Sequence, residues 1–208
     1  MKPNAFNRSK FLSKAFSCSI LLALLALLAA MPAAQAANDT WTGGTSATWA
    51  TTTNWSGGTV PGSTSANSDI ATFNSATYSF QPTAAGSYFL GGLIFGSGNT
   101  NGITITTGTG NGRMNIGSSG IQMNAGTGVV SIGAAGAGTQ GINITANQSW
   151  TNDSSSLLNI SRVSVDDTLT GTYTITINGS GSGGVTVNSN LNDDNTAASA
   201  TRKAAVVI

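Results

Sequence analysis

After residue 37 the chain is built from short segments in which apolar and polar residues alternate, separated by Gly, Asn and Ser. Clear examples lie at residues 102–105, 120–123, 141–144 and 173–177. Alternation with a period of two and a high content of β-branched residues is typical of β-strands. No segment after residue 37 has the i, i+3, i+4 apolar spacing of an amphipathic helix. The pattern therefore predicts an all-β protein.

The spacing of these segments predicts a repeat. A Gly-Ile-x-Ile or Gly-Ile-x-Met unit begins at Gly102, Gly120 and Gly141. Repeats of about 20 residues that contain several short strands are typical of a β-solenoid, in which each coil stacks on the next. The steps between the three glycines are close to that length, so we expect roughly five coils between Leu90 and Leu191.

Alternation also predicts which side chains point inward. We expect Ile and Met to form apolar ladders inside the solenoid, with Thr, Ser and Asn in solvent and Gly or Asn at corners of positive φ. The residues expected to point inward and to be neighbours on successive coils are Ile103, Ile105, Ile121, Met123, Ile142 and Ile144. The alternative is a β-sandwich or jelly roll, which also has short strands and frequent turns.

Aromatic residues are concentrated before the repeats. Residues 38–95 contain Trp41, Trp49, Trp55, Phe73, Tyr78, Phe80, Tyr88, Phe89 and Phe95, whereas only Trp150 and Tyr173 follow. The first coil of a solenoid needs a cover, because it otherwise exposes apolar side chains and unpaired strand edges. We therefore interpret this aromatic segment as an N-terminal cap.

The first 36 residues have the pattern of a secretory signal peptide. A polar, basic start precedes an unbroken apolar run at 20–30, and small residues follow, ending in Ala34-Gln35-Ala36. Eleven apolar residues are fewer than the ~20 needed to span a bilayer, which disfavours a membrane anchor. Cys18 lies at the edge of this run, so the mature chain has no cysteine and its stability cannot come from disulfides.

Charge is scarce throughout the chain. Only 7% of the residues are charged, with Lys+Arg 8, Asp+Glu 7 and His 0, against roughly a quarter in ordinary soluble domains. Four of the cations lie in the first fourteen residues, which leaves four against seven Asp in the mature chain. A basic nucleic-acid surface and histidine-based catalysis or metal binding are therefore excluded. We expect no cofactor, no nucleic-acid partner and no membrane contact of the mature form.

Several motifs together resemble autotransporter-associated β-strand repeat proteins, which are large exported, passenger-like bacterial proteins. The opening motifs are Trp41-Thr42-Gly43-Gly44, Trp49, Asn54-Trp55, Pro61 and the segment 69–73, and the coil-like ones are 91–95, 148–150 and 181–187. The resemblance covers Asn38 to about Ala198. It implies a right-handed parallel β-helix with a cell-surface, adhesive or matrix role and no known catalytic residues.

The resemblance and the pattern together divide the chain into four parts. These are a signal peptide at 1–36, a Trp-rich cap at 37–89, solenoid coils at 90–195, and a disordered or truncated tail at 196–208. Family members continue beyond Asp194 into further coils, so the chain resembles an N-terminal portion of a longer passenger. An uncovered last coil exposes unpaired strand edges, which favours self-association through that end.

Acidic residues offer the main enzymatic hypothesis. Some parallel β-helices cleave acidic polysaccharides, and the adjacent pairs here are Asp166-Asp167 and Asp193-Asp194. Neighbouring strand residues point to opposite faces, so each pair presents one carboxylate per face or lies in a solvated turn. Segments 152–153 and 192–195 are oxygen-rich, but they lack the Gly-Gly-x-Gly-x-Asp repeat of calcium-binding β-helices. We expect no catalytic and no metal site.

The tryptophans offer a second function. Exposed indole rings stack on sugars, so Trp41, Trp49 or Trp55 would suit a carbohydrate-binding module, whereas buried rings would cover the first coil. The leading prediction is a non-enzymatic exported structural or adhesive protein at the cell surface or outside the cell. A carbohydrate-binding module is the alternative and a polysaccharide-degrading enzyme is the third. The expected partners of the chain are cell-surface polysaccharide or other exported proteins.

The signal peptide gives the first testable prediction. Cleavage should fall between Ala36 and Ala37, because the small-x-small motif ends at Ala36 after an apolar run of signal-peptide length. Mass spectrometry of the exported protein should therefore give a chain that begins at Ala37. A mass that includes Met1 would contradict the prediction.

Overall fold

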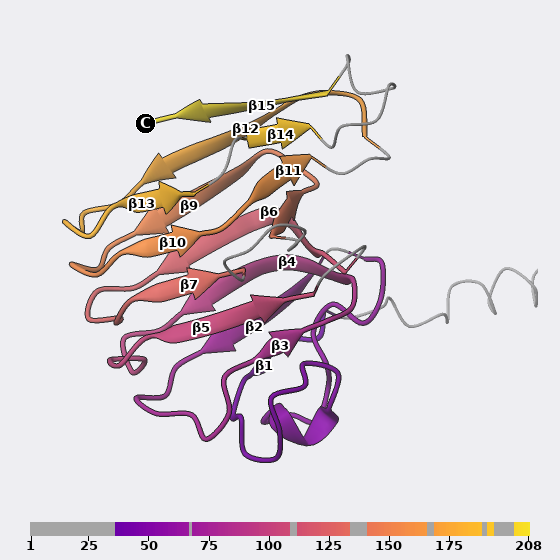
Figure 1. Ribbon diagram of the computed structural model, residues 1–208, viewed down its shortest axis with the longest axis vertical. Coiled ribbons are helices and arrows are strands. Elements are labelled where there is room, and N and C mark those ends of the chain that lie inside the picture. The colour runs from indigo at the N-terminus through magenta and orange to yellow at the C-terminus, as the bar shows by residue number, and fades with distance from the viewer. Residues whose placement is uncertain are drawn as a thin grey trace, which may run out of the picture. The chain divides into compact units, whose positions relative to one another are not determined.

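A computed structural model describes residues 36–66, 68–108, 112–133, 141–165, 169–188, 191–193 and 202–208 (Figure 1). These residues belong to one compact unit that begins at Ala36. Strands and turns make up almost all of it, and its one helical segment is the 3-10 helix η1, Thr52–Asn54. No helix within the described ranges has the length and hydropathy needed to cross a membrane.

The described residues form fifteen strands in two sheets. A ten-stranded sheet contains β1 (Asp39–Thr40), β2 (Asp69–Phe73), β4 (Tyr88–Phe95), β6 (Met114–Met123), β8 (Ile142–Ile144), β9 (Gln148–Asn152), β11 (Val163–Val165), β12 (Gly171–Asn178), β14 (Leu191–Asp193) and β15 (Arg202–Val207). A five-stranded sheet contains β3 (Thr83–Ala84), β5 (Ile103–Thr107), β7 (Val130–Ile132), β10 (Leu158–Ile160) and β13 (Val185–Val187).

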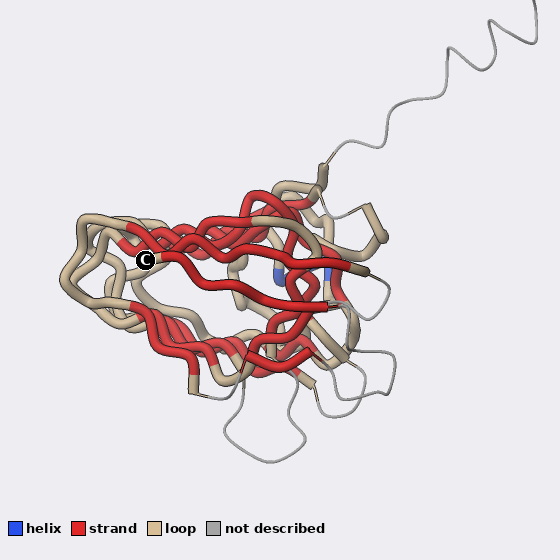
Figure 2. Tube along the Cα trace, turned by 90° about the horizontal axis from the view of Figure 1, so that it is seen from above, coloured by secondary structure: helices blue, strands red, loops and turns tan. Residues whose placement is uncertain are grey.

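Every paired strand in both sheets runs parallel to its neighbours, which identifies a β-solenoid of about four coils. The predicted parallel β-helix is therefore confirmed. Neighbouring strands in a sandwich or jelly roll are mostly antiparallel, so that alternative is wrong. Figure 2, a view from above, shows the chain winding around a common interior.

Each coil has three sides. The first side contains β8, β11, β14 and the first parts of β4 and β6. The second side contains β1, β2, β9, β12, β15 and the second parts of β4 and β6. The five-stranded sheet is the third side. Strand β4 turns from the first side to the second where its register against β6 shifts, between Leu90 and Gly92.

The predicted period was wrong. Ile103 pairs with Val130, and Val130 pairs with Leu158, so these three positions are the ones that lie one full coil apart. The three Gly-Ile units lie on three different sides: one in β5, one in β6 and one in β8. The shorter steps between them therefore measure only part of a coil, and the chain forms about four coils where five were expected.

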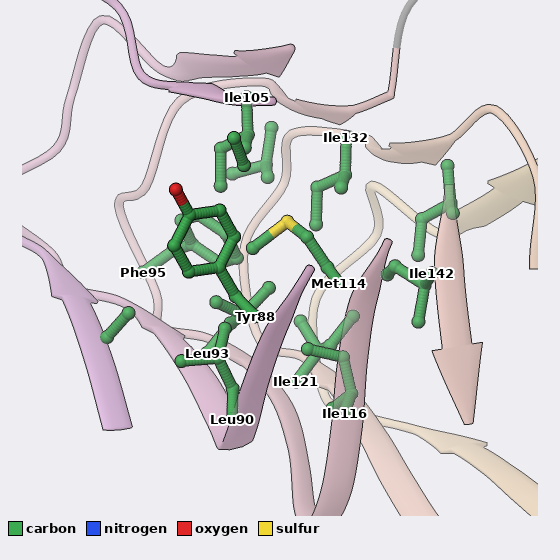
Figure 3. Close-up of a cluster of buried hydrophobic side chains, with 14 of the residues drawn as sticks. Tyr88, Leu90, Leu93, Phe95, Ile105, Met114, Ile116, Ile121, Ile132 and Ile142 are labelled. Carbon is green, nitrogen blue, oxygen red and sulfur yellow. The ribbon is translucent and has the colours of Figure 1, made fainter. Parts of the chain in front are cut away.

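The inward residues were predicted correctly. All six of the Ile and Met side chains expected inside are at most 4% exposed and belong to one continuous core. Figure 3 shows Ile105, Ile121 and Ile142 among the side chains of that core. They are not neighbours in one ladder, because Ile121 pairs with Leu93 and Trp150 rather than with another Gly-Ile unit.

Glycine begins the first two of these units because the corner requires it. Gly102 has φ +79° and Gly120 has φ +63°, in the left-handed region. A Cβ atom would lie 2.1 Å from the carbonyl oxygen of Val129 at Gly102, and 2.0 Å from that of Ser149 at Gly120. Only glycine fits such a close approach of two coils at a positive φ.

A row of buried polar side chains runs along the first side. Asn115 Nδ2 donates to the Tyr88 carbonyl at 3.2 Å, Asn143 Nδ2 donates to Asn115 Oδ1 at 3.2 Å, and Ser164 Oγ donates to Asn143 Oδ1. All three side chains are at most 4% exposed. Because each coil supplies the hydrogen-bond partner of the next, these polar groups avoid the penalty of unpaired burial.

The tail predicted at 196–208 lies partly within the described residues. Residues 202–207 form β15 and pair in parallel with β12, from Gly171–Arg202 to Thr176–Val207. The apolar, β-branched end of the chain thus occupies the edge that β12 leaves open. Residues 194–201 lie outside the described ranges. Val206 and Val207 are 38% and 52% exposed, and self-association through this end stays a prediction.

The core gives the second testable prediction. Replacing Ile142 with Asp places an unpaired carboxylate at a position that is 1% exposed, so the free energy of unfolding should fall by several kcal/mol. Urea denaturation followed by circular dichroism measures the loss. The matched control is Gln122→Asp, because Gln122 is an exposed residue of β6. Equal stability of the two variants would contradict the inward placement of Ile142.

Candidate functional site

The three tryptophans of the cap pack against one another. Trp49 is central, with its ring centroid 4.8 Å from that of Trp55 and 6.3 Å from that of Trp41. It also contacts Phe73 of β2 and Tyr88 of β4, at centroid distances of 6.0 and 5.4 Å. The cluster therefore joins the segment 41–55 to the first strands of the solenoid, as a cap requires.

Each indole N–H in this cluster donates to a backbone carbonyl. Trp41 Nε1 donates to Phe80 O at 3.1 Å, and Trp49 Nε1 donates to Pro61 O at 3.0 Å. Trp55 Nε1 donates to Trp49 O at 2.8 Å. A buried indole needs such a partner, so these bonds fix the orientation of each ring.

Burial bears directly on the carbohydrate-binding hypothesis. Trp41, Trp49 and Trp55 are 1%, 0% and 2% exposed. A sugar stacks on the open face of an aromatic ring, and none of these three rings has an open face in the structure. Their position agrees with the cap interpretation, and stacking on them would require the cap to open.

Asp39 organises the loop beside this cluster. Its carboxylate accepts hydrogen bonds from the backbone N–H groups of Thr40, Gly57 and Thr59 and from Ser56 Oγ. Desolvation by burial raises the pKa of Asp39, but these hydrogen bonds together outweigh it and hold the pKa below its usual value. The group is therefore a charged structural anchor for residues 56–59.

The structure brings no acidic cluster together among the residues it describes. Asp153 accepts hydrogen bonds from Ser180 N and Oγ at 2.8 and 2.9 Å, which lower its pKa. This contact ties one coil to the next at the surface. Asp166, Asp167 and Asp194 lie outside the described residues. Within the described ranges, no group of three His, Cys, Asp or Glu is placed to hold a metal ion.

The outer face of the five-stranded sheet is the clearest candidate for a binding surface. Successive strands place Thr104, Ser131, Asn159 and Thr186 in register, one from each coil. Thr104 and Thr186 are exposed, and the two residues between them are half-buried. Parallel strands lie about 4.8 Å apart, so this polar ladder repeats a hydroxyl or amide group at a regular interval.

A shallow depression of about 220 Å³ adjoins the start of the polar ladder. Its lining consists of Gln81, Asn101, Gly102, Ile103, Thr104, Val129 and Ser131. Gln81 Oε1 accepts a hydrogen bond from Thr104 N at 2.9 Å, which fixes the amide beside the sheet. Val129 is 51% exposed and supplies an apolar surface next to these polar groups.

This surface suits a neutral ligand rich in hydroxyl groups. Side-chain hydroxyl and amide groups both donate and accept hydrogen bonds, and the lining contains no charged residue. The sequence reasoning missed the surface because it used the wrong period. Thr104, Ser131, Asn159 and Thr186 recur once in every full coil, so an alignment of the sequence at the coil length would have revealed them.

Comparisons of the chain with protein families, with curated proteins and with solved structures find no match.

The tryptophan cluster gives the third testable prediction. Trp49→Ala should lower the free energy of unfolding by about 3–5 kcal/mol, because it removes the central ring of the cap core. Chemical denaturation measures this change. Unchanged stability combined with lost polysaccharide binding would instead identify Trp49 as a ligand-binding residue.

Proposed function

We propose that this chain is a non-enzymatic exported protein with a structural or adhesive role at the cell surface or in the extracellular matrix. It acts as part of a β-helical passenger of the autotransporter-associated β-strand repeat type. Its partner is a neutral polysaccharide, which binds along the outer face of the five-stranded sheet.

The observation that carries this proposal is the polar ladder and its adjoining depression. Thr104 and Ser131 belong to both, so a polymer that follows the ladder also meets Gln81 and Val129. Sugar hydroxyls would hydrogen-bond to the ladder, and the apolar face of a sugar ring would contact Val129. A polysaccharide has a repeating structure, so it can use the same contact on successive coils.

The scarcity of charge supports a neutral partner. Only 7% of the residues are charged, and the outward ladder residues of the five-stranded sheet are Thr, Ser and Asn. Binding to such a face depends on many weak hydrogen bonds and is insensitive to salt, unlike the binding of acidic polymers to basic patches. Multiple copies or further coils would raise the overall affinity by multivalency.

The ladder gives the fourth testable prediction. The double variant Thr104→Val, Ser131→Ala removes two outward hydroxyls, each worth about 0.5–1.5 kcal/mol, so affinity for a neutral polysaccharide should fall about 5- to 150-fold. A glycan array followed by titration of the strongest hit measures this change. The processed full chain is used, and its circular dichroism spectrum establishes that the variant folds.

A matched control makes the same side-chain changes on the ten-stranded sheet. Ser149→Ala with Thr172→Val also removes two exposed hydroxyls, from β9 and β12, and should leave binding unchanged. Equal losses in the two double variants would rule out the five-stranded sheet as the binding surface. Absence of binding to every polysaccharide on the array would reject an adhesive role toward glycans.

A further inference from the structure

The cap contains two buried carboxylates and no basic side chain. Asp39 is 5% exposed and Asp69 is 3% exposed. Between Lys14 and Arg113 the sequence has no Lys, Arg or His. A buried carboxylate is costly unless hydrogen bonds or a nearby cation compensate it, so each of these two groups needs a source of compensation.

The two carboxylates differ in how far they are compensated. Asp39 accepts hydrogen bonds from four groups, three backbone N–H groups and one hydroxyl. From the described residues, Asp69 accepts two hydrogen bonds, from Ala37 N to Oδ1 at 2.7 Å and from Gly62 N to Oδ2 at 2.8 Å. One of the two donors on Asp69 is therefore the backbone nitrogen of Ala37, the residue that follows the predicted cleavage site.

The segment around Ala37 is held in place by neighbouring contacts. Ala36 is exposed and Ala37 is half-buried. Asn38 Oδ1 accepts a hydrogen bond from Ile70 N at 3.0 Å, and Asp39 then begins β1 opposite Ala71 of β2. Cleavage before Ala37 would leave β1 intact and would free the nitrogen that contacts Asp69. It would also remove the Ala36 carbonyl, which accepts a hydrogen bond from Asn38 N at 3.0 Å.

We propose that the new N-terminus created by signal-peptide removal is the counter-ion of Asp69, so that processing completes the cap of the solenoid. The proposal rests on the predicted cleavage site. A signal peptidase hydrolyses the Ala36–Ala37 peptide bond with one water molecule. The carboxylate remains on Ala36, and the released amine of Ala37 takes up a proton to become an ammonium group beside Asp69 Oδ1.

This change adds a positive charge to the donor of a hydrogen bond whose acceptor is already a carboxylate, at a distance already set by the fold. The ammonium group gains a Coulomb attraction to the carboxylate that a neutral amide lacks, and the partly buried site reduces screening by solvent. The nitrogen is positioned before cleavage by Asn38 and β1, so little ordering is needed. The processed chain should thus resist unfolding better than a chain whose Ala37 nitrogen is uncharged.

The pH dependence follows from the groups around this nitrogen. Asp69 faces it from β2, Asp39 on its own segment is turned toward residues 56–59, and Tyr88 of β4 lies beside Gly62. Burial raises the pKa of Tyr88, so its phenol is neutral where the amine titrates. The next cation in the sequence is Arg113, whose carbonyl accepts a hydrogen bond from Tyr88 N.

An adjacent carboxylate raises the pKa of the amine above the ~7.7–8.0 of an unperturbed N-terminus. A group whose pKa is higher in the folded state than in the unfolded state stabilises the fold fully at pH values below its unfolded-state pKa. This stabilisation is lost as the pH rises through the folded-state pKa. The added stability should therefore be present at about pH 6 and absent above about pH 10.

The fifth prediction is tested on the chain expressed with its leader in an exporting bacterium, with the N-terminus determined by mass. Lys203 carries the only other amine of the processed chain, so Lys203→Arg is included in all samples and acetylation then acts on Ala37 alone. The midpoint of urea denaturation is measured for four chains. These are the chain with Asp69 and the Asp69→Asn variant, each with a free and with an acetylated N-terminus. A titration of the Ala37 amine by NMR gives its pKa directly.

We expect acetylation to lower the midpoint at pH 6 when Asp69 is present, and to have no effect above about pH 10 or in Asp69→Asn. Asp39→Asn is the matched control, because it should lower stability yet keep the effect of acetylation. If Asp69→Asn does not fold, a glycine inserted before Ala37 moves the ammonium by about 3.8 Å and should reproduce the acetylated midpoint.

Two results would overturn the proposal. One is a urea midpoint that acetylation leaves unchanged at pH 6 in the chain with Asp69. The other is an acetylation effect on the midpoint that is as large in the Asp69→Asn variant as in the chain with Asp69. A different N-terminus in the mass spectrum would reject the cleavage prediction instead. The ion pair is then tested on a chain released at Ala37 from a removable tag. None of these outcomes depends on polysaccharide binding, so they are separate from the proposed function.

Discussion

Backbone hydrogen bonds between successive coils are the interaction on which the rest of this structure depends. Most strands are three to five residues long, and a coil of such strands cannot enclose its own apolar side chains. Parallel pairing with the coils on either side builds the two sheets and stacks Ile, Leu, Val and Met into one continuous core. The same stacking brings Asn115, Asn143 and Ser164 within hydrogen-bond reach of one another. The close approach of coils at the corners also explains glycine at positions 102 and 120, where a side chain would collide with the next coil.

Local patterns predicted the strands and the inward side chains well, because alternation with a period of two depends only on neighbouring residues. The length of a coil could not be obtained in the same way. All three sides of the solenoid use similar Gly-Ile-x-Ile segments, so the distance between two such segments measures either part of a coil or a whole one. The length of a full coil equals the spacing of residues that pair on successive coils, such as the polar pairs Asn115 with Asn143 on one side and Thr104 with Ser131 on another. A sequence search at this longer interval identifies the polar pairs together with the apolar set Ile103, Val130 and Leu158.

The candidate binding surface was missed for the same reason, whereas the cap was recognised from composition alone. Nine aromatic residues before the repeats indicate a large apolar area that must be buried together. Composition does not show which faces of the rings stay open. That depends on Pro61, Phe80 and the backbone of Trp49, whose carbonyls accept the indole N–H groups and turn the rings inward. These acceptors are distant in sequence from their donors or belong to loops, so no local pattern identifies them.

The scarcity of charged residues has a cause in the solenoid and a consequence in the cap. Like charges at one position of successive coils would stack about 4.8 Å apart and repel one another, which favours Thr, Ser and Asn on the outward positions. A chain with so few charged side chains must satisfy its buried carboxylates by other means. Asp39 does so with backbone N–H groups and a hydroxyl, and Asp69 uses the nitrogen of Ala37 together with that of Gly62. The contact at Ala37 differs from the others in kind, because its nitrogen belongs to the peptide bond at which we expect signal-peptide cleavage. If cleavage occurs there, the new N-terminus would supply the cap with a positive charge that its side chains lack.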